Sequence, residues 1–196
     1  MEKLMLNNKV IGIVKHNSIG YFHQALPDTP FSNFYIVDSP FKLWFYPNKG
    51  IVSSKEITNL GRPHIGSFLS VEQVFAFGKA CEMHDQEMME KIYKLQANNS
   101  VQYKILGRKV KNYNDRRWKE RAMIWMKAGM KAKFEQDKFS KDALCLTQNF
   151  RLIETNPNDK EWGIGCDING NFDQALGQNH QGQLLMEVRE LIYSNK

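Results

Sequence analysis

Residues 70–80 read SVEQVFAFGKA, and this stretch opens the helical part of the chain. Ser70 and Gln73 form a capping-box pattern, in which each side chain satisfies a backbone N–H that the first helical turn leaves unbonded. The pattern predicts a helix that begins at Val71 and runs towards His84 or beyond.

Helical signals dominate the chain after this point. Residues 86–98 continue in helical composition, and residues 141–147 suggest a short helix. Asn114 or Asp115 can cap a longer helix, whose inner face recurs at helical spacing: Trp118, Ala122, Trp125, Met126 and Gly129. One apolar stripe marks the last helix and consists of Leu184, Leu185, Val188, Leu191 and Ile192.

Short strands are predicted towards the N-terminus, at residues 10–14, 20–22 and 41–46, and Trp44 in the last of them is expected in the core. Residues 47–66 are rich in Pro, Gly, Asn and Ser, which favours a surface excursion or a hairpin with a long loop. Because helices outnumber strands and do not alternate with them, the fold class is predicted as α+β. We expect a predominantly helical single domain with a small N-terminal β-sheet, in which residues 1–30 supply strands and residues 31–196 the main domain.

The composition indicates a soluble protein of the cytoplasm. Hydrophobic residues make up 42% of the 196 residues, yet no run approaches the roughly 20 apolar residues of a membrane span. The first residues, MEKLMLNNKVIGIVKHN, carry a short apolar run without a small-residue cleavage site, so no signal peptide is expected. Cys81, Cys145 and Cys166 lack CxxC spacing, which favours a reducing compartment over a disulfide framework.

Basic residues concentrate between positions 104 and 141, in a chain with a net charge of +6. The stretch includes Arg108, Lys109, Lys111, Arg116, Arg117, Lys119, Arg121, Lys127, Lys131 and Lys133. A solvated helix face explains such a run, and attraction to the phosphates of a nucleotide or nucleic acid is the alternative. Charge by itself leaves both interpretations open.

Glu72 and Lys79 lie seven residues apart on the helix predicted from Val71, so they share one face, two turns apart. Glu72 is in the first turn, where the helix dipole stabilises a carboxylate. With Phe75 and Ala76 between them, the two residues could form a partly buried acid–base pair. Ordinary surface positions on an amphipathic helix are the alternative.

A second stretch, residues 153–165, reads IETNPNDKEWGIG and presents an acid beside a large ring. Its NPN tripeptide consists of turn formers, and the turn displays Asp159 and Trp162. Gly163 lets the backbone pass close to a bound molecule. An acid beside an indole on one turn suits a small polar ligand that carries a flat ring.

The order of these motifs resembles the NADAR (YbiA-like) family. SVEQVFAFGKA is similar to the family's S-x-E-x-x-F-x-x-x-K segment, and IETNPNDKEWGIG follows in the family's order. ILGR at residues 105–108, Trp118 and AKFEQ at residues 132–136 lie between them. GQNHQGQLLMEVR at residues 177–189 resembles the closing motif, and SNF at residues 32–34 with PF at residues 40–41 resembles the opening.

The resemblance implies an N-glycosidase that cuts the bond between ribose C1′ and a nitrogen, without a metal or organic cofactor. The implied substrate is an ADP-ribosyl adduct, such as ADP-ribosylated guanine on a nucleotide or nucleic acid, or a related phosphorylated riboside. The alternatives are a ribosylaminopyrimidine phosphate of the riboflavin pathway and a non-catalytic ADP-ribose-binding module. Lys79 is implied as the nucleophile that forms an imine with C1′, and Glu72 and Asp159 as the groups that move protons. Trp118 and Trp162 would hold the ring or the sugar.

Further substrate contacts are expected from polar groups around these motifs. Arg108 is a candidate for bidentate phosphate binding, with a structural salt bridge as the alternative. Residues 177–182 lead into the last helix, whose free N–H groups can bind an anion, and they supply Asn179 and Gly182 as candidates. A simple helix entry is the alternative there. Asn33 is a candidate contact to the sugar or base, and a turn role is the alternative.

No metal site is predicted. Residues 167–178 alternate like a calcium loop, but Phe172 replaces its glycine and Gln178 its closing glutamate. The histidines show no paired spacing for zinc. The chain also departs from the NADAR pattern, since Gln73 replaces the usual histidine and Val74 the aromatic that often follows. Together with residues 47–66, an insertion that could overhang the pocket, these changes leave the substrate open.

Overall fold

The computed structural model describes residues 2–46, 50–51 and 62–194, and the chain divides into two compact units. The sheet unit comprises Met1–Tyr35 and Asp137–Lys196, and the helical unit comprises Ile36–Gln136. The first and last parts of the chain therefore build one unit, and the middle of the chain builds the other. The predicted boundary at residue 30 stays a prediction.

The sheet unit contains a four-stranded sheet in the order β1 (Glu2–Leu6), β2 (Lys9–Lys15), β3 (Ser18–Tyr21) and β6 (Arg151–Glu154). The first three strands pair antiparallel, and β3 pairs parallel with β6. Asn7 and Asn8 connect β1 to β2 with φ values of 49° and 62°. Both lie in the left-handed region that a two-residue type I′ turn requires, and asparagine tolerates it.

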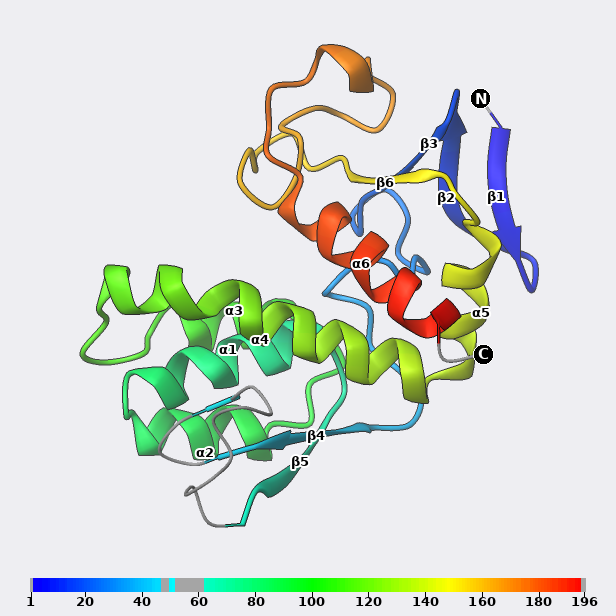
Figure 1. The fold of residues 1–196 in the computed structure, drawn as a ribbon. Coiled ribbons are helices and arrows are strands. Elements are labelled where there is room, and N and C mark those ends of the chain that lie inside the picture. The colour runs from blue at the N-terminus through cyan, green and yellow to red at the C-terminus, as the bar shows by residue number, and fades with distance from the viewer. Residues whose placement is uncertain (1, 47–49, 52–61, 195–196) are drawn as a thin grey trace. The chain divides into compact units, whose positions relative to one another are not determined.

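Helix α6 (His180–Ser194) lies alongside β6, and α5 (Lys138–Leu146) and the short 3-10 helix η2 (Phe172–Gln174) belong to the same unit (Figure 1). Of the predicted apolar stripe on α6, only Leu191 is exposed, at 39%. The buried guanidinium of Arg189 donates to the Thr147 hydroxyl at 2.9 Å and to the Phe150 carbonyl at 2.8 Å. These bonds hold the segment before β6 against the helix.

The helical unit begins with a hairpin of β4 (Phe41–Phe45) and β5 (His64–Phe68). Side chains alternate between buried and exposed along β4, and Trp44 is 58% exposed. The prediction that Trp44 lies in the core is therefore wrong, because the two-residue period of a strand places it opposite its buried neighbours. Most of the predicted excursion, residues 47–49 and 52–61, lies outside the described residues, and residues 64–66 belong to β5.

Helix α1 (Val71–Glu82) is central to the helical unit and contacts α2 (Gln86–Lys94), α3 (Val101–Gly107) and α4 (Asp115–Gln136). It begins as predicted, since the Ser70 hydroxyl accepts the N–H of Gln73 at 3.2 Å. The Gln73 amide does not complete the capping box, because it accepts the N–H of Leu69 at 2.8 Å and donates to the Ile92 carbonyl at 3.2 Å. Gln73 therefore links the start of α1 to α2.

The architecture confirms the predicted α+β class, with helices dominating and a small sheet formed mainly by N-terminal strands. The predicted core position of Trp125 on α4 is also confirmed, because its side chain is fully buried. No helix in the described part of the chain is both long and apolar enough to cross a bilayer.

Candidate active site

Glu72 and Lys79 occupy one face of α1 in the helical unit, as their spacing predicts. Glu72 is buried, with 6% of its surface exposed, and Lys79 is half-buried. The Lys79 ammonium lies 5.2 Å from the centre of the Trp118 ring and 5.4 Å from that of Tyr113. The Phe75 ring centre is 6.0 Å away. Three aromatic rings thus surround one amine, within the range of cation–π contacts.

The environment of Lys79 lowers its pKa from the usual 10.5. Burial is the largest cause, since it disfavours the charged ammonium, and the Arg108 guanidinium acts in the same direction. The Glu72 carboxylate opposes both, because its negative charge favours the ammonium. The net effect increases the fraction of neutral amine, which is the form of lysine that attacks carbon.

Trp118 is fixed in place at the start of α4. Asn114 caps this helix, because its side-chain carbonyl accepts the N–H of Arg117 at 2.9 Å. The Trp118 ring is 6% exposed and meets the Phe75 ring edge-on at 4.8 Å. Helix α4 therefore presents the indole to the face of α1 that carries Lys79.

A buried carboxylate, Glu82, joins α1 to α4. It accepts the Arg121 Nε–H at 2.9 Å and the Trp125 indole N–H at 2.8 Å, and it pairs with Arg117 at 3.6 Å. A Cβ atom at Gly78 would lie 2.3 Å from the Trp125 ring, so glycine is needed where these helices touch. The two helices that carry Lys79 and Trp118 are thereby held at a fixed separation.

Arg108 ends α3 and is exposed, and within the described residues no carboxylate lies at ion-pair distance from it. The predicted alternative, a structural salt bridge, is therefore not observed in this part of the chain. Lys109 is likewise without a carboxylate partner among the described residues.

Most other residues of the basic stretch have acidic partners. Exposed i,i+4 pairs join Lys119 to Asp115, Arg116 to Glu120 and Lys131 to Glu135. Such pairs are typical of a solvated helix face and contribute little to stability. The arrangement favours a solvated face for most of the stretch and leaves Arg108 and Lys109 as cations suited to an anion.

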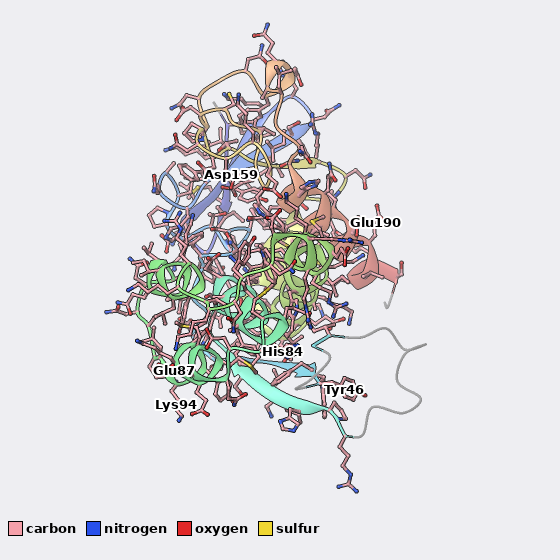
Figure 2. The ribbon with its side chains drawn as sticks, turned by 90° about the vertical axis from the view of Figure 1, so that its left-hand side faces the viewer. Tyr46, His84, Glu87, Lys94, Asp159 and Glu190 are labelled. Carbon is pink, nitrogen blue, oxygen red and sulfur yellow. The ribbon has the colours of Figure 1, made fainter. Side chains whose placement is uncertain are left out.

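The acid-and-indole turn lies in the sheet unit, on the loop after β6 (Figure 2 labels Asp159). One oxygen of the half-buried Asp159 carboxylate accepts the backbone N–H of Trp162 at 2.8 Å and that of Glu161 at 3.0 Å. The same residue's carbonyl accepts the N–H of Gly165 at 3.0 Å. Asp159 thus shapes the turn that presents Trp162, and its predicted part in proton transfer stays a prediction.

Asn179 and Gly182 join α6 to β6. The Asn179 side chain accepts the N–H of Glu154 at 3.0 Å and donates to the Leu152 carbonyl at 2.9 Å, at a backbone φ of +55°. A Cβ atom at Gly182 would lie 2.1 Å from the same carbonyl oxygen. Backbone hydrogen bonds therefore explain the asparagine at position 179, and close packing explains the glycine at position 182. Their predicted contact with substrate stays a prediction.

The other two candidates of the sheet unit are equally constrained. Gly163 is buried, and a Cβ atom there would lie 2.7 Å from the Glu154 carbonyl, so only glycine fits without a shift. Asn33 is half-buried within a turn, where the Ser32 hydroxyl accepts the N–H of Phe34 at 3.1 Å. Substrate contact by Asn33 and Gly163 stays a prediction.

Each unit thus gathers its own set of candidates. The helical unit brings together four of the predicted residues, Glu72, Lys79, Arg108 and Trp118. The sheet unit contains the remaining six: Asn33, Asp159, Trp162, Gly163, Asn179 and Gly182. In the described residues, no cluster of three or more His, Cys, Asp or Glu side chains could hold a metal ion.

Three functional candidates were not predicted from the sequence. Tyr113 flanks Lys79, and its only sequence signal is its place just before the cap of α4. Glu154 is a buried carboxylate at the end of β6. Burial of the Tyr21 side chain raises the pKa of Tyr21, and the negative charge of Glu154 raises it further. His180 lies with its ring 6.1 Å from that of Trp162, and its buried Nδ1 has no hydrogen-bond partner in the described part of the chain.

The sequence model of the NADAR domain matches residues 21–193. The chain belongs to the NADAR family. This NADAR chain is 30% identical over 154 residues to an N-glycosidase of Acanthamoeba polyphaga mimivirus, across 76% of its own length and 85% of the viral protein.

Two further proteins match this chain, one over a smaller share of its length and the other at lower sequence identity. The protein irg-1 of Caenorhabditis elegans is 30% identical over 138 residues, which cover 66% of the NADAR chain and 63% of the nematode protein. The NMR structure of Escherichia coli YbiA matches with a TM-score of 0.65 at 21% identity, across 94% of this chain and 90% of that one. YbiA therefore shares the fold of this NADAR protein.

Proposed function

We propose that this NADAR protein is an N-glycosidase that hydrolyses the ribose C1′–N bond of an ADP-ribosyl adduct, such as ADP-ribosylated guanine, or of a related phosphorylated riboside. The observation that carries the proposal is the Lys79 amine, whose pKa is lowered where three aromatic rings surround it beside Glu72 and Arg108. An ordinary surface lysine would keep its pKa near 10.4 and stay protonated. The similarity to a viral N-glycosidase supports the same reaction class.

The reaction begins with the neutral Lys79 amine. Its lone pair forms a bond to C1′ while the C1′–N bond breaks, and the departing nitrogen keeps the bonding pair and takes a proton. Nζ then loses its two protons. One balances the proton taken by the departing nitrogen, and the other is delivered to O4′ as the C1′–O4′ bond breaks, which gives an imine of the opened ribose. Water then adds to the imine, which releases the sugar and restores the amine.

Carboxylates assist these steps. Positive charge develops at C1′ as the base departs, and an ionised carboxylate stabilises it. Glu72 is buried on the same face of α1 as Lys79, so it can give a proton to the departing nitrogen and regain one from Nζ. The family's motif supports Asp159 as a second proton-transfer group and Trp162 as a stacking surface. Tyr113 and Trp118 enclose the amine and reduce its contact with water.

Recognition of the substrate involves phosphate. Arg108 and Lys109 are adjacent cations without a described carboxylate partner, and the Arg108 charge helps to lower the pKa of Lys79. A guanidinium can bind phosphate through two parallel hydrogen bonds. This geometry favours a nucleotide or sugar phosphate as part of the substrate.

The test compares two substrates under borohydride trapping. The protein is incubated with DNA that carries ADP-ribosylated guanine and, separately, with the ribosylaminopyrimidine phosphate of the riboflavin pathway. We expect base release from the first and a reduced covalent adduct that maps to Lys79 by mass spectrometry. Release from the second alone would assign the alternative substrate. Tight binding of both without release of base or sugar would show an ADP-ribose-binding module instead.

The positive charge of Arg108 is expected to affect how kcat depends on pH. Activity that needs the neutral amine rises with pH as the pH passes the pKa of Lys79, which lies below 10.5 in the folded protein. Arg108→Gln removes a charge that lowers this pKa, so the rising limb of kcat against pH is expected to move to higher pH. Because Arg108 is exposed, high salt should reduce the shift.

The matched control for this measurement is Lys109→Gln. Lys109 is the adjacent cation but is not among the causes that act on Lys79. Its replacement is expected to change KM through weaker phosphate binding while the rising limb of kcat stays in place. A shift of equal size in both variants would mean that general surface charge, and not Arg108, sets the pKa.

A further inference from the structure

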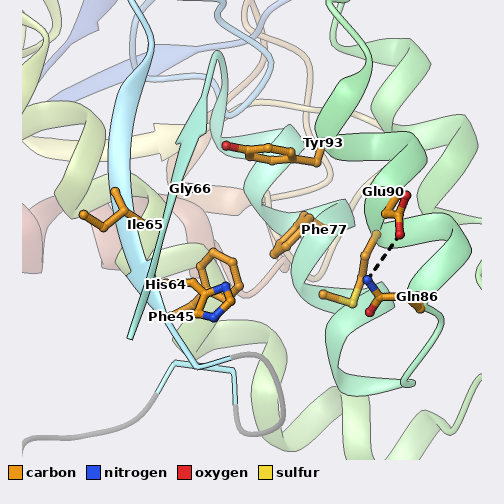
Figure 3. Close-up of a pocket in the computed structure, with 9 residues that line it drawn as sticks. Phe45, His64, Ile65, Gly66, Phe77, Gln86, Glu90 and Tyr93 are labelled. Atoms are coloured by element: carbon orange, nitrogen blue, oxygen red, sulfur yellow. Dashed lines mark hydrogen bonds between the residues drawn. The ribbon is translucent and has the colours of Figure 1, made fainter. Parts of the chain in front are cut away.

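A slot of about 260 Å³ lies between β5 and α2 in the helical unit, apart from Lys79 (Figure 3). Its walls are the rings of Phe45, Phe77 and Tyr93 with the thioether of Met89, and His64, Gln86 and Glu90 stand at its edges. Phe77 and Lys79 are two positions apart on α1, which places them on nearly opposite faces of the helix. The slot is therefore separate from the candidate active site.

The pairing of the hairpin shows which backbone groups face the slot. Lys42 and Ser67 oppose each other in the β4–β5 register. The Lys42 N–H and carbonyl both bond to the Gln136 side-chain amide, at 2.8 Å each, and the Ser67 N–H donates to the Tyr93 hydroxyl at 3.4 Å. All of these groups point away from the partner strand, as in a non-hydrogen-bonded antiparallel pair.

Alternation along the strand then fixes the direction of the Ile65 backbone. Ile65 is two residues before Ser67, so its N–H and carbonyl also point away from β4, on the side where α2 packs. No described residue bonds to either group, and the Ile65 side chain is 48% exposed. A donor and an acceptor on one residue thus border an aromatic slot.

The charges at the edge of the slot favour a neutral ligand. The Glu90 carboxylate accepts the Lys94 ammonium at 3.0 Å and the Gln86 amide at 3.5 Å. Because the carboxylate is already paired, the slot offers aromatic surface and a backbone donor–acceptor pair and not an unpaired negative charge. Its volume is below the usual range of about 300–1,000 Å³ for small-molecule sites, which suits one or two fused rings.

We propose that this slot binds a neutral, flat nitrogen heterocycle in which a ring nitrogen lies next to an exocyclic amino group. The ring nitrogen accepts the Ile65 N–H, and the amino group donates to the Ile65 carbonyl. The flat faces of the ring pack against Phe77 and Tyr93, where stacked or edge-on aromatic contacts are favourable. The proposal is independent of the glycosidase reaction, because it uses none of the residues assigned to that reaction.

The test is a titration of ¹⁵N-labelled protein with adenine and with 6-methylpurine, followed by the backbone amide signals. The two probes have nearly the same shape, but 6-methylpurine lacks the amino donor. We expect adenine to shift the Ile65 amide and to bind about three- to tenfold more tightly than 6-methylpurine, which is the effect of one hydrogen bond. Equal affinities for the two probes, or no shift at Ile65 with adenine, would overturn the proposal.

A matched pair of variants adds a second measurement. Tyr93→Ala removes a wall of the slot and is expected to weaken adenine binding about tenfold. Tyr193→Ala removes a tyrosine of similar exposure on α6, 38% against 39%, and should leave the affinity unchanged. An equal loss in both variants, or no loss in Tyr93→Ala, would place the adenine elsewhere. Because the titration reports binding and not turnover, its outcome does not depend on the proposed glycosidase activity.

Discussion

Lys79→Ala is expected to lower kcat/KM for base release by about 10⁴-fold or more, because it removes the group that forms the covalent bond to C1′. Lys79 is half-buried at the end of α1, among the rings of Phe75, Tyr113 and Trp118, so its truncation leaves the helix intact. The measurement is initial-rate release of free base from an ADP-ribosylated substrate, followed by chromatography. The borohydride adduct is expected to disappear in the same variant.

Two control variants distinguish a role of Lys79 as nucleophile from a role of its positive charge. Lys79→Arg keeps a cation among the aromatic rings but cannot become neutral near physiological pH, so the same loss of activity is expected. Lys94→Ala removes an exposed lysine of α2 whose ion pair with Glu90 is solvated, and its activity should match the wild type. Substantial turnover by Lys79→Arg would show that Lys79 acts by charge and not through an imine.

Glu82→Ala is expected to lower the free energy of unfolding by about 3–5 kcal/mol, the usual effect of removing one partner from a buried ion pair. The substitution leaves the Arg121 guanidinium without its carboxylate partner and the buried Trp125 indole N–H without its acceptor. It also removes the hydrogen bonds that link α1 to α4 through this side chain. Urea unfolding followed by tryptophan fluorescence measures the effect.

Glu87→Ala is the matched control for this stability prediction. Glu87 also pairs with a cation, Lys111, at 2.7 Å, but both side chains are largely exposed, at 78% and 65%. Exposed pairs of this kind contribute about 0–1 kcal/mol, so little change is expected. Similar losses in both variants would show that burial of Glu82 does not strengthen its contribution.

The helices were largely predictable from the sequence, because their signals are local. Ser70 marked the start of α1, and the apolar spacing of residues 118–129 marked α4. In contrast, β1, β5, β6 and α3 were not identified as separate elements. Each is seven residues or fewer, and strands such as β6 are stabilised by pairing with residues far away in the sequence.

The candidate site was predictable where one helix carries it. The spacing of Glu72 and Lys79 on α1 is a property of the helix itself, so the sequence placed both on one face. The aromatic surroundings of Lys79 were only partly foreseen, because Tyr113 reaches it from the segment before α4. Similarly, nothing in the sequence showed that the Asn179 side chain would be used to bind the backbone of β6.

By itself, the sequence determined the helical periods, the N-terminal cap of α1, the α+β class and the shared helix face of Glu72 and Lys79, since all of these depend on residue types at short spacings. The role of Lys79 as the candidate nucleophile was implied by the resemblance to the NADAR family. Only the tertiary structure decided which groups change the pKa of Lys79 and which backbone groups of β5 face away from β4. The pKa of Lys79 depends on its burial and on the charges of Glu72 and Arg108 around it. The open edge at Ile65 depends on how two strands pair. Both are long-range effects, which arise only when segments far apart in the chain are packed together.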